Sequence, residues 1–260
     1  LKALEAEAIV PWANGVAIDF GATGFWNYNG TTATILTTLD ADLIVPWNNE
    51  ILVDFPGYGL YSHNGTSWKK LKALEAEAIV PWANGVAIDF GATGFWNYNG
   101  TSTVILTNLN TDLMLAWNSE ILVNLPGYGL YSHNGTSWKK LKALEAEEIV
   151  PWANGVAIDF GPSGFWNYNG TTTSILTTLN ADMTTAWGDE VAISFPGYGL
   201  YSRNASSFTK LSSLTAQDLI PWANGLAVDF GPGGFWNYNG SVMQIWSNLD
   251  ADFAIDINLP

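Results

Sequence analysis

Acidic or amide residues return in pairs every 35 residues along the chain. The pairs are Glu5/Glu7, Asp40/Asp42, Glu75/Glu77, Asn110/Asp112, Glu145/Glu147, Asn180/Asp182 and Asp250/Asp252, with Ala216/Asp218 as the exception. Calcium and magnesium ions prefer ligand sets made only of oxygen. We therefore select Asp40, Asp42, Asp112 and Asp182 as candidate calcium ligands. The structural alternative is that these side chains accept hydrogen bonds from turn backbones, and their spacing matches no EF-hand loop.

A tyrosine at the centre of the phrase PGYG forms a second candidate site, and it occurs at Tyr58, Tyr128 and Tyr198. The flanking glycines predict a loop tip, so we expect these side chains to be exposed. Flat aromatic faces suit sugar rings. Together with Asp40 and Asp42, the tyrosines are our candidate ligand-binding residues, and local packing over a neighbouring repeat is the alternative.

The residue types give little support for a catalytic function. The only histidines are His63 and His133, and there is no cysteine. No Ser/His/Asp group and no histidine-based metal site can be assembled from them. Many equivalent carboxylates also argue against one asymmetric active site. We expect the protein not to be an enzyme.

Composition limits the partners. The 260 residues include 9 basic and 24 acidic side chains, a net charge of -15, which repels phosphate backbones and argues against nucleic acid. No apolar run reaches ~18 residues, so we expect no membrane span. Cations, glycans and basic proteins fit the charge. Hydrophobic residues make up 48% of the chain, enough for a large core.

The elements that position these residues follow from an internal repeat. Seven tryptophans are spaced at 35 residues without an insertion, at Trp12, Trp47, Trp82, Trp117, Trp152, Trp187 and Trp222. We interpret them as structural wedges between repeats. Each repeat contains four extended segments, which in the first repeat are 9–12, 16–20, 25–28 and 31–37. Asn29-Gly30 between the last two predicts a type I′ hairpin turn. The run LKALEAEA favours a helix by composition, yet the repeat aligns it with LTTLDADL, so we expect strand and then loop.

Four short strands in each of seven repeats predict an all-β, seven-bladed β-propeller of 35-residue blades, and a linear β-solenoid is the alternative. The predicted blades are 8–38, 43–73, 78–108, 113–143, 148–178, 183–213 and 218–248. Residues 249–260 are then a surplus strand or a closure segment. A spare strand of this kind could join subunits into a homo-oligomer.

An aspartate ends the second strand of most repeats. It is Asp19, Asp54, Asp89, Asp159 and Asp229, replaced by Asn124 and Ser194 in two repeats. Asn and Ser keep the hydrogen bonding and lose the charge. We therefore expect a structural role, in which the side chain ties down the glycine-bounded loop that follows.

The phrase GLYSHNGTSW at 59–68 and 129–138, within aromatic-rich repeats free of insertions, resembles repetitive β-propellers, including the tachylectin-like and related propeller lectins. That resemblance implies multivalent carbohydrate binding outside the cell or at the cell surface. A structural or surface-assembly scaffold, in which the surplus strand makes the subunit contacts, is the alternative.

Overall fold

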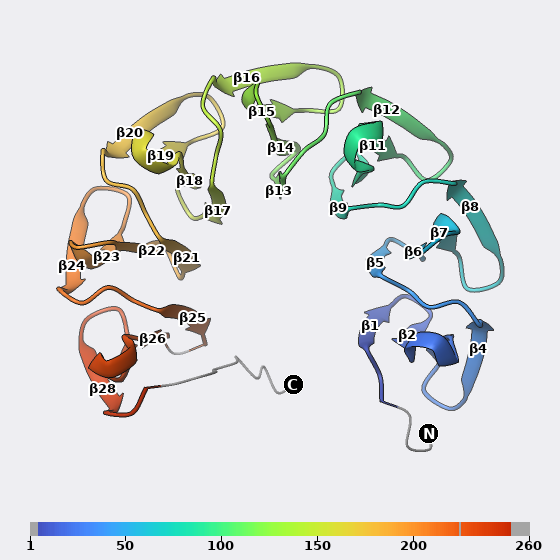
Figure 1. The fold of residues 1–260 in the computed structure, drawn as a ribbon, viewed down its shortest axis with the longest axis horizontal. Helices are drawn as coiled ribbons and strands as arrows, with labels where there is room; N and C mark the ends of the chain where they lie inside the picture. The colour runs from blue at the N-terminus through green and yellow to red at the C-terminus, as the bar shows by residue number, and fades with distance from the viewer. Residues whose placement is uncertain (1–4, 224, 251–260) are drawn as a thin grey trace. The chain divides into compact units, whose positions relative to one another are not determined.

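The computed structural model describes residues 5–223 and 225–250, and in them the chain forms twenty-eight strands and four short 3₁₀ turns. The strands form seven four-stranded antiparallel sheets, each in simple chain order. This is an all-β seven-bladed β-propeller, as the repeat predicted (Figure 1). None of the helical segments in the described residues is long and apolar enough to span a membrane.

The bounds of the strands repeat with the sequence. The first two sheets contain β1 (Ala8–Trp12), β2 (Gly15–Asp19), β3 (Phe25–Tyr28), β4 (Ala33–Thr37), β5 (Leu43–Trp47), β6 (Glu50–Phe55), β7 (Gly59–His63) and β8 (Trp68–Lys72). The next two contain β9 (Ala78–Trp82), β10 (Gly85–Asp89), β11 (Phe95–Tyr98), β12 (Thr103–Thr107), β13 (Leu113–Trp117), β14 (Glu120–Leu125), β15 (Gly129–His133) and β16 (Trp138–Lys142).

The last three sheets continue the pattern. They contain β17 (Glu148–Trp152), β18 (Gly155–Asp159), β19 (Phe165–Tyr168), β20 (Thr173–Thr177), β21 (Met183–Trp187), β22 (Glu190–Phe195), β23 (Gly199–Arg203), β24 (Phe208–Ser212), β25 (Asp218–Trp222), β26 (Gly225–Asp229), β27 (Phe235–Tyr238) and β28 (Met243–Ser247). The 3₁₀ turns, in the odd-numbered sheets only, are Gly21–Thr23, Gly91–Thr93, Gly161–Ser163 and Gly231–Gly233.

The chain divides into two compact units. The first comprises Leu1–Pro126 with Ser132–Lys139, and the second comprises Gly127–Tyr131 with Lys140–Pro260. In the first unit, the first strands of successive sheets adjoin, so β1 lies beside β5, β5 beside β9 and β9 beside β13. In the second unit, β17 adjoins β21 and β21 adjoins β25 in the same way. Adjoining first strands bring the faces of neighbouring sheets together.

Burial of both sheet faces explains the apolar second strands. In β10, Val86 and Ile88 pack against Leu52 of the preceding sheet, and all five residues of the strand are buried. In β2, Ala17 faces the other way, toward Ile51 of the following sheet. A strand covered on both sides needs apolar residues at consecutive positions, and this explains why VAID lacks the alternation of a half-exposed sheet.

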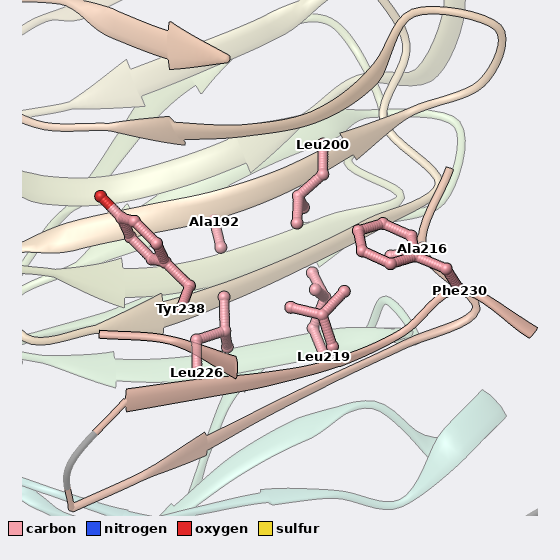
Figure 2. Packing of buried hydrophobic residues seen from close by; sticks show 8 residues of the cluster. Ala192, Leu200, Ala216, Leu219, Leu226, Phe230 and Tyr238 are labelled. Atoms are coloured by element: carbon pink, nitrogen blue, oxygen red, sulfur yellow. The ribbon is translucent and has the colours of Figure 1, made fainter. Parts of the chain in front are cut away.

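The second unit shows the same packing between its last two sheets. Figure 2 shows Leu200 and Ala192 of the sixth sheet facing Leu226 and Leu219 of the seventh, with Phe230 and Tyr238 at the two ends of the cluster. Leu200 and Leu226 are fully buried. Side chains from two consecutive repeats therefore share each such core, and no repeat buries its apolar residues alone.

A β-bulge recurs where the third strand pairs with the fourth. Phe25 pairs with Thr37 and Trp26 with Ile35, which leaves Leu36 outside the register. In the fifth sheet, Phe165 pairs with Thr177 and Trp166 with Ile175, leaving Leu176. Each bulged leucine packs against the core of the following sheet.

The turn after the third strand differs from the prediction. Gly30 has a φ of 96°, whereas Asn29 is not among the residues with positive φ, so a type I′ turn with Asn29 and Gly30 at its centre was wrong. The amide of Asn29 donates to the carbonyl of Thr32 at 3.2 Å, which makes Gly30 and Thr31 the central pair. A single positive φ at the first central position is typical of type II′ turns. The Asn29 side chain stabilises the turn by accepting from the amides of Thr31 and Thr32.

Two other predictions concern the repeat boundaries. LKALEAEA at 71–78 contributes its first two residues to β8, forms a loop, and gives Ala78 to β9, so strand followed by loop is confirmed. The surplus strand expected within 249–260 falls almost wholly on residues 251–260, outside the described part of the chain.

Candidate binding loops

Two sets of loops meet at one end of each sheet. The loop that enters the first strand lies against the loop that joins the second strand to the third. In the first sheet, the amide of Glu7 donates to the carbonyl of Asp19 at 2.9 Å, and the amide of Gly21 donates to Oδ1 of Asp19 at 3.1 Å. The second-strand aspartate therefore organises this end of the sheet.

The same hydrogen bond recurs in the other odd-numbered sheets. Gly91 donates to Asp89 at 3.0 Å, Gly161 to Asp159 at 3.0 Å, and Gly231 to Asp229 at 2.8 Å. These aspartates are buried. Their carboxylates hold the glycine-bounded loops, which is the structural role expected from the sequence.

In the second and sixth sheets the equivalent side chain reaches the entry loop of the next sheet. Asp54 Oδ1 accepts from the amide of Ala76 at 3.1 Å, and the Ser194 hydroxyl accepts from the amide of Ala216 at 3.0 Å. Ser194 performs this task without a charge. The position therefore serves as a hydrogen-bond acceptor between consecutive repeats.

Burial raises the pKa of three of these carboxyl groups, Asp19, Asp89 and Asp159. Desolvation, followed by repulsion from Asp40, raises the pKa of Asp19 to about 6. Desolvation likewise raises the pKa of Asp89 to about 6 and that of Asp159 to about 7, in each case with repulsion from a glutamate of the entry loop. The backbone amides that donate to them lower the pKa but do not cancel the effect of burial.

The structure gives the four candidate calcium ligands different surroundings. Asp40 lies with Glu7 and Asp19, and one carboxylate oxygen from each is within 4.8 Å of the other two. Asp42, Asp112 and Asp182 are exposed and join no such group within residues 5–223 and 225–250. Three carboxylates suit a hard cation, but calcium takes six to eight oxygens, and one Asp19 oxygen is already used by Gly21.

The candidate tyrosines lie at exposed loop tips. Tyr58, Tyr128 and Tyr198 are 53%, 52% and 54% exposed. The Tyr58 amide donates to the Phe55 carbonyl at 2.9 Å, which closes a tight turn beneath the ring. These loops therefore present an aromatic face to solvent from a hydrogen-bonded base.

Glutamates of the neighbouring entry loops anchor two of these tyrosine loops. Glu75 Oε1 accepts from the amide of Gly57 at 2.6 Å, and Glu145 accepts in the same way from Gly127. The sequence analysis missed this role, although the sequence contains a signal for it. In both anchored loops, a glutamate follows the first glycine of PGYG by 18 residues. The third loop has Thr215 at that place.

The entry loops also correct one alignment. The amide of Gln217 donates to the carbonyl of Asp229, as Glu7, Glu77 and Glu147 do to the equivalent carbonyls of their own sheets. Thr215 and Gln217 are therefore the equivalents of the acidic pair in the seventh repeat, and the choice of Ala216/Asp218 was wrong. This loop carries no charge at either position.

The first-strand tryptophans lie where consecutive sheets meet. The Trp12 indole donates to Asn27 Oδ1 at 2.8 Å within its own sheet, and its ring lies 5.9 Å from that of His63 in the next sheet. Trp47 packs against Tyr98 of the next sheet at 5.7 Å. The Trp12 indole is thus held both by its own repeat and by the next one.

The described basic residues lie in strands, and two of them, Lys72 and Lys142, end strands that lead into entry loops. In the described residues, every lysine and arginine lies within a strand: Lys69, Lys70, Lys72, Lys139, Lys140, Lys142, Arg203 and Lys210, in β8, β16, β23 and β24. Lys72 Nζ lies 3.8 Å from the centre of the Trp96 ring, and Lys142 is placed similarly over Trp166. The described loops therefore carry acidic charge only.

Comparisons with known proteins support the fold. No family model matches the chain, and no curated protein is similar to it in sequence. Among solved structures, BamB from Moraxella catarrhalis is similar with a TM-score of 0.61 at 14% identity, over 96% of this chain and 88% of that one.

Two further structures are similar over most of their length. The computationally designed Ika8 protein has a TM-score of 0.56 at 12% identity, over 94% of this chain and 85% of that one. Sqt1 from Saccharomyces cerevisiae has a TM-score of 0.52 at 11% identity, over 96% and 87%. Identities this low show the propeller fold alone, and they do not single out the propeller lectins.

Proposed function

We propose that this protein is a non-catalytic protein-interaction scaffold that binds a basic partner through its loop-bearing ends. The observation that carries the proposal is the set of exposed tyrosines, Tyr58, Tyr128 and Tyr198, on loops with hydrogen-bonded bases. Tyrosine is enriched among the residues that dominate protein-protein binding energy. It offers a large contact area at a small cost in conformational entropy.

The anchoring of the loops supports binding without rearrangement. The amide of Gly57 is held by Glu75, and the amide of Tyr58 by Phe55. A loop already fixed in its bound conformation loses little entropy when a partner docks. Repetition adds to this advantage, since a partner that engages two loops gains from effective concentration.

Charge indicates the type of partner. The net charge of -15 and the absence of lysine and arginine from the described loops favour a negative potential at these ends, although Lys72 and Lys142 end the strands beside them. Negative potential speeds the encounter with basic surfaces and opposes acidic ones. We infer that the partner carries a lysine- or arginine-rich segment.

A non-catalytic role agrees with the use of the buried carboxylates. Asp19, Asp89 and Asp159 have the raised pKa values that general acids often need, but their oxygens accept from backbone amides of the glycine loops. Groups occupied in this way serve the fold. The repetition of equivalent groups also gives no repeat a distinct reactive centre.

Carbohydrate binding is the second candidate function. The exposed tyrosine rings favour it, because a ring face open to solvent can stack on a sugar, and the resemblance to propeller lectins points the same way. In contrast to a basic peptide, a neutral glycan gains nothing from the negative potential. The two candidates therefore differ in their response to salt.

The test uses two arrays probed with the same protein. The wild type and a triple variant, Tyr58→Ala, Tyr128→Ala and Tyr198→Ala, are applied to a peptide array containing basic and acidic sequences and to a glycan array. We expect basic peptides to bind, binding to weaken with salt, and the triple variant to lose most of the signal. Glycan binding without peptide binding would support the lectin function, and silence on both arrays would contradict the scaffold.

We also propose that the protein works outside the cell or at its surface, since a chain without cysteine has no thiol to be oxidised there. Fractionation of the native source with protease treatment of intact cells tests this location. Protection from protease until lysis would contradict it.

A further inference from the structure

A cavity lies between the fifth and sixth sheets, inside the second unit. Its volume is about 180 Å³, and its walls are Thr177, Leu179, Phe195, Tyr201 and Phe208. Four of these five walls are apolar or aromatic side chains. The cavity adjoins the base of one tyrosine loop, since the carbonyl of its wall residue Phe195 accepts from the amide of Tyr198 at 3.0 Å, but the proposed scaffold function does not require it.

The equivalent space between the first and second sheets contains an indole ring. Trp68 stands at the place of Phe208, and its ring centre lies 5.3 Å from that of Phe55 and 6.3 Å from that of Tyr61. Its Nε1 donates to the carbonyl of Leu36 at 3.3 Å. That carbonyl belongs to the bulged residue of β4, which the ladder leaves out of register.

Phenylalanine in place of tryptophan leaves part of this space unfilled. Phe208 is 6.3 Å from Phe195, against 5.3 Å for the Trp68 and Phe55 pair, and it has no N–H to offer. The bulged residue here is Leu176, the equivalent of Leu36. The fifth and sixth sheets thus keep the walls of an indole site, Phe195, Tyr201 and Leu179, and lack part of the ring that fills it elsewhere.

We propose that this cavity binds a small, neutral, planar aromatic molecule with one ring N–H, of the indole type. An engineered apolar cavity of about 150 Å³ is large enough to bind benzene, so the volume here suits a ring of this class. Phe195 and Tyr201 offer edge-to-face contacts like those that Trp68 makes with Phe55 and Tyr61. The ring N–H donates to the carbonyl of Leu176, as Trp68 does to Leu36.

The stacking on Phe208 keeps the site from collapsing. The Arg203 guanidinium lies 5.1 Å from the centre of the Phe208 ring, and Tyr201 lies 6.4 Å from it at nearly a right angle. A ring held by a cation and two aromatic neighbours has few alternative rotamers. The Phe208 ring therefore does not rotate into the cavity and fill it.

The test uses indole as the probe and measures thermal unfolding together with binding stoichiometry by calorimetry. We expect the wild type to bind one indole and to unfold at a higher temperature in its presence. Phe208→Trp should bind none and should be more stable than the wild type without ligand. Trp68→Phe should open a second site and bind two.

The ligand 1-methylindole tests the hydrogen bond, because it keeps the ring and lacks the N–H. We expect it to bind about three- to tenfold more weakly than indole, the range typical of one neutral hydrogen bond. Circular dichroism establishes that each variant is folded. No binding to the wild type, or equal binding by Phe208→Trp, would overturn the proposal, and so would a Trp68→Phe variant that gains no site.

Discussion

Three buried aspartates of the odd-numbered sheets, Asp19, Asp89 and Asp159, lose hydration and lie close to other carboxylates. Asp159 is 2% exposed, and the pKa of its carboxyl is raised from 3.8 to about 7. Asn124 occupies the equivalent place in the fourth sheet, where its amide donates to Asp112 Oδ1 at 2.8 Å. The chain itself therefore shows that a neutral side chain fits this environment.

Asp159→Asn should increase the free energy of unfolding at pH 8 and remove part of its pH dependence. The folded state holds a proton on Asp159 between pH 4 and 7 and the unfolded state does not, so wild-type stability falls as pH rises through that range. The expected increase in the free energy of unfolding at pH 8 is on the order of 2 kcal/mol. Urea unfolding at pH 4.5 and pH 8 measures it. Asp182→Asn, at an exposed carboxylate, is the control, and an equal change in both variants would contradict the argument.

The two histidines should give stability the opposite pH dependence, so that their contribution falls as the pH falls. Burial lowers the pKa of His63 and of His133 from 6.5, and each Nδ1 accepts from a glycine amide at 3.1 Å. Protonation would break that hydrogen bond, so their contribution to stability is lost as pH falls below about 6.5.

The double variant His63→Asn and His133→Asn keeps an acceptor near the position of Nδ1 and cannot gain the charge. We expect it to be less stable than the wild type at pH 8, since ring packing on Trp68 and Trp138 is lost, and the deficit to shrink toward pH 5. Urea unfolding across this range measures the difference. A deficit that is constant with pH would show that the histidines do not titrate on unfolding.

The strands could be predicted from the repeat because every residue is supported by equivalents 35 or 70 positions away. LKALEAEA illustrates this, since its own composition favours a helix and its alignment gave strand and loop correctly. The hairpin turn was harder to predict, because the Asn29 side chain accepts two backbone amides and shifts the turn by one residue. The rule that Asn-Gly forms a type I′ turn does not consider hydrogen bonds from the backbone to the asparagine side chain.

Gly85, which starts a second strand, and Gly30, in a hairpin turn, should differ sharply in their tolerance of alanine. A Cβ on Gly85 would lie 2.2 Å from the carbonyl oxygen of Tyr98 in the neighbouring strand, whereas one on Gly30 would meet nothing within 4 Å. Both have positive φ, which costs alanine about 1 kcal/mol.

We therefore expect Gly85→Ala to lower the free energy of unfolding by at least about 3 kcal/mol and Gly30→Ala by about 1 kcal/mol. Denaturant unfolding gives both values under the same conditions. Similar losses in the two variants would mean that strand β10 relaxes away from Tyr98, and the steric argument would fail.

At the scale of the whole molecule, the fold can be predicted from the sequence more completely than the functional sites can. The propeller follows from four strands in each of seven repeats. The exposed tyrosines follow from their glycine neighbours, whereas the environments of Asp40 and Asp112 depend on which side chains fold back onto them. The cavity had a signal in one letter, Phe208 in place of Trp68, but its walls come from two repeats and are visible only in three dimensions.

The net charge of -15 should make stability sensitive to salt. Repulsion among carboxylates opposes the compact state, and raising the ionic strength from about 0.01 M to about 0.15 M shortens its range from about 30 Å to about 8 Å. We expect the free energy of unfolding at pH 8 to rise by on the order of 1 kcal/mol over that change. Neutral sucrose at matched osmolality is the control, and no response to sodium chloride would contradict the expectation.

The confinement of lysine and arginine to strands has a consequence for digestion. Trypsin cuts only after these residues and must draw several residues around the scissile bond into an extended form in its own cleft. In the described chain all such bonds lie in or directly after β8, β16, β23 and β24, where the ladder holds the backbone. Native protein should therefore resist trypsin, and the rate of nicking should report how often those strands leave their sheets.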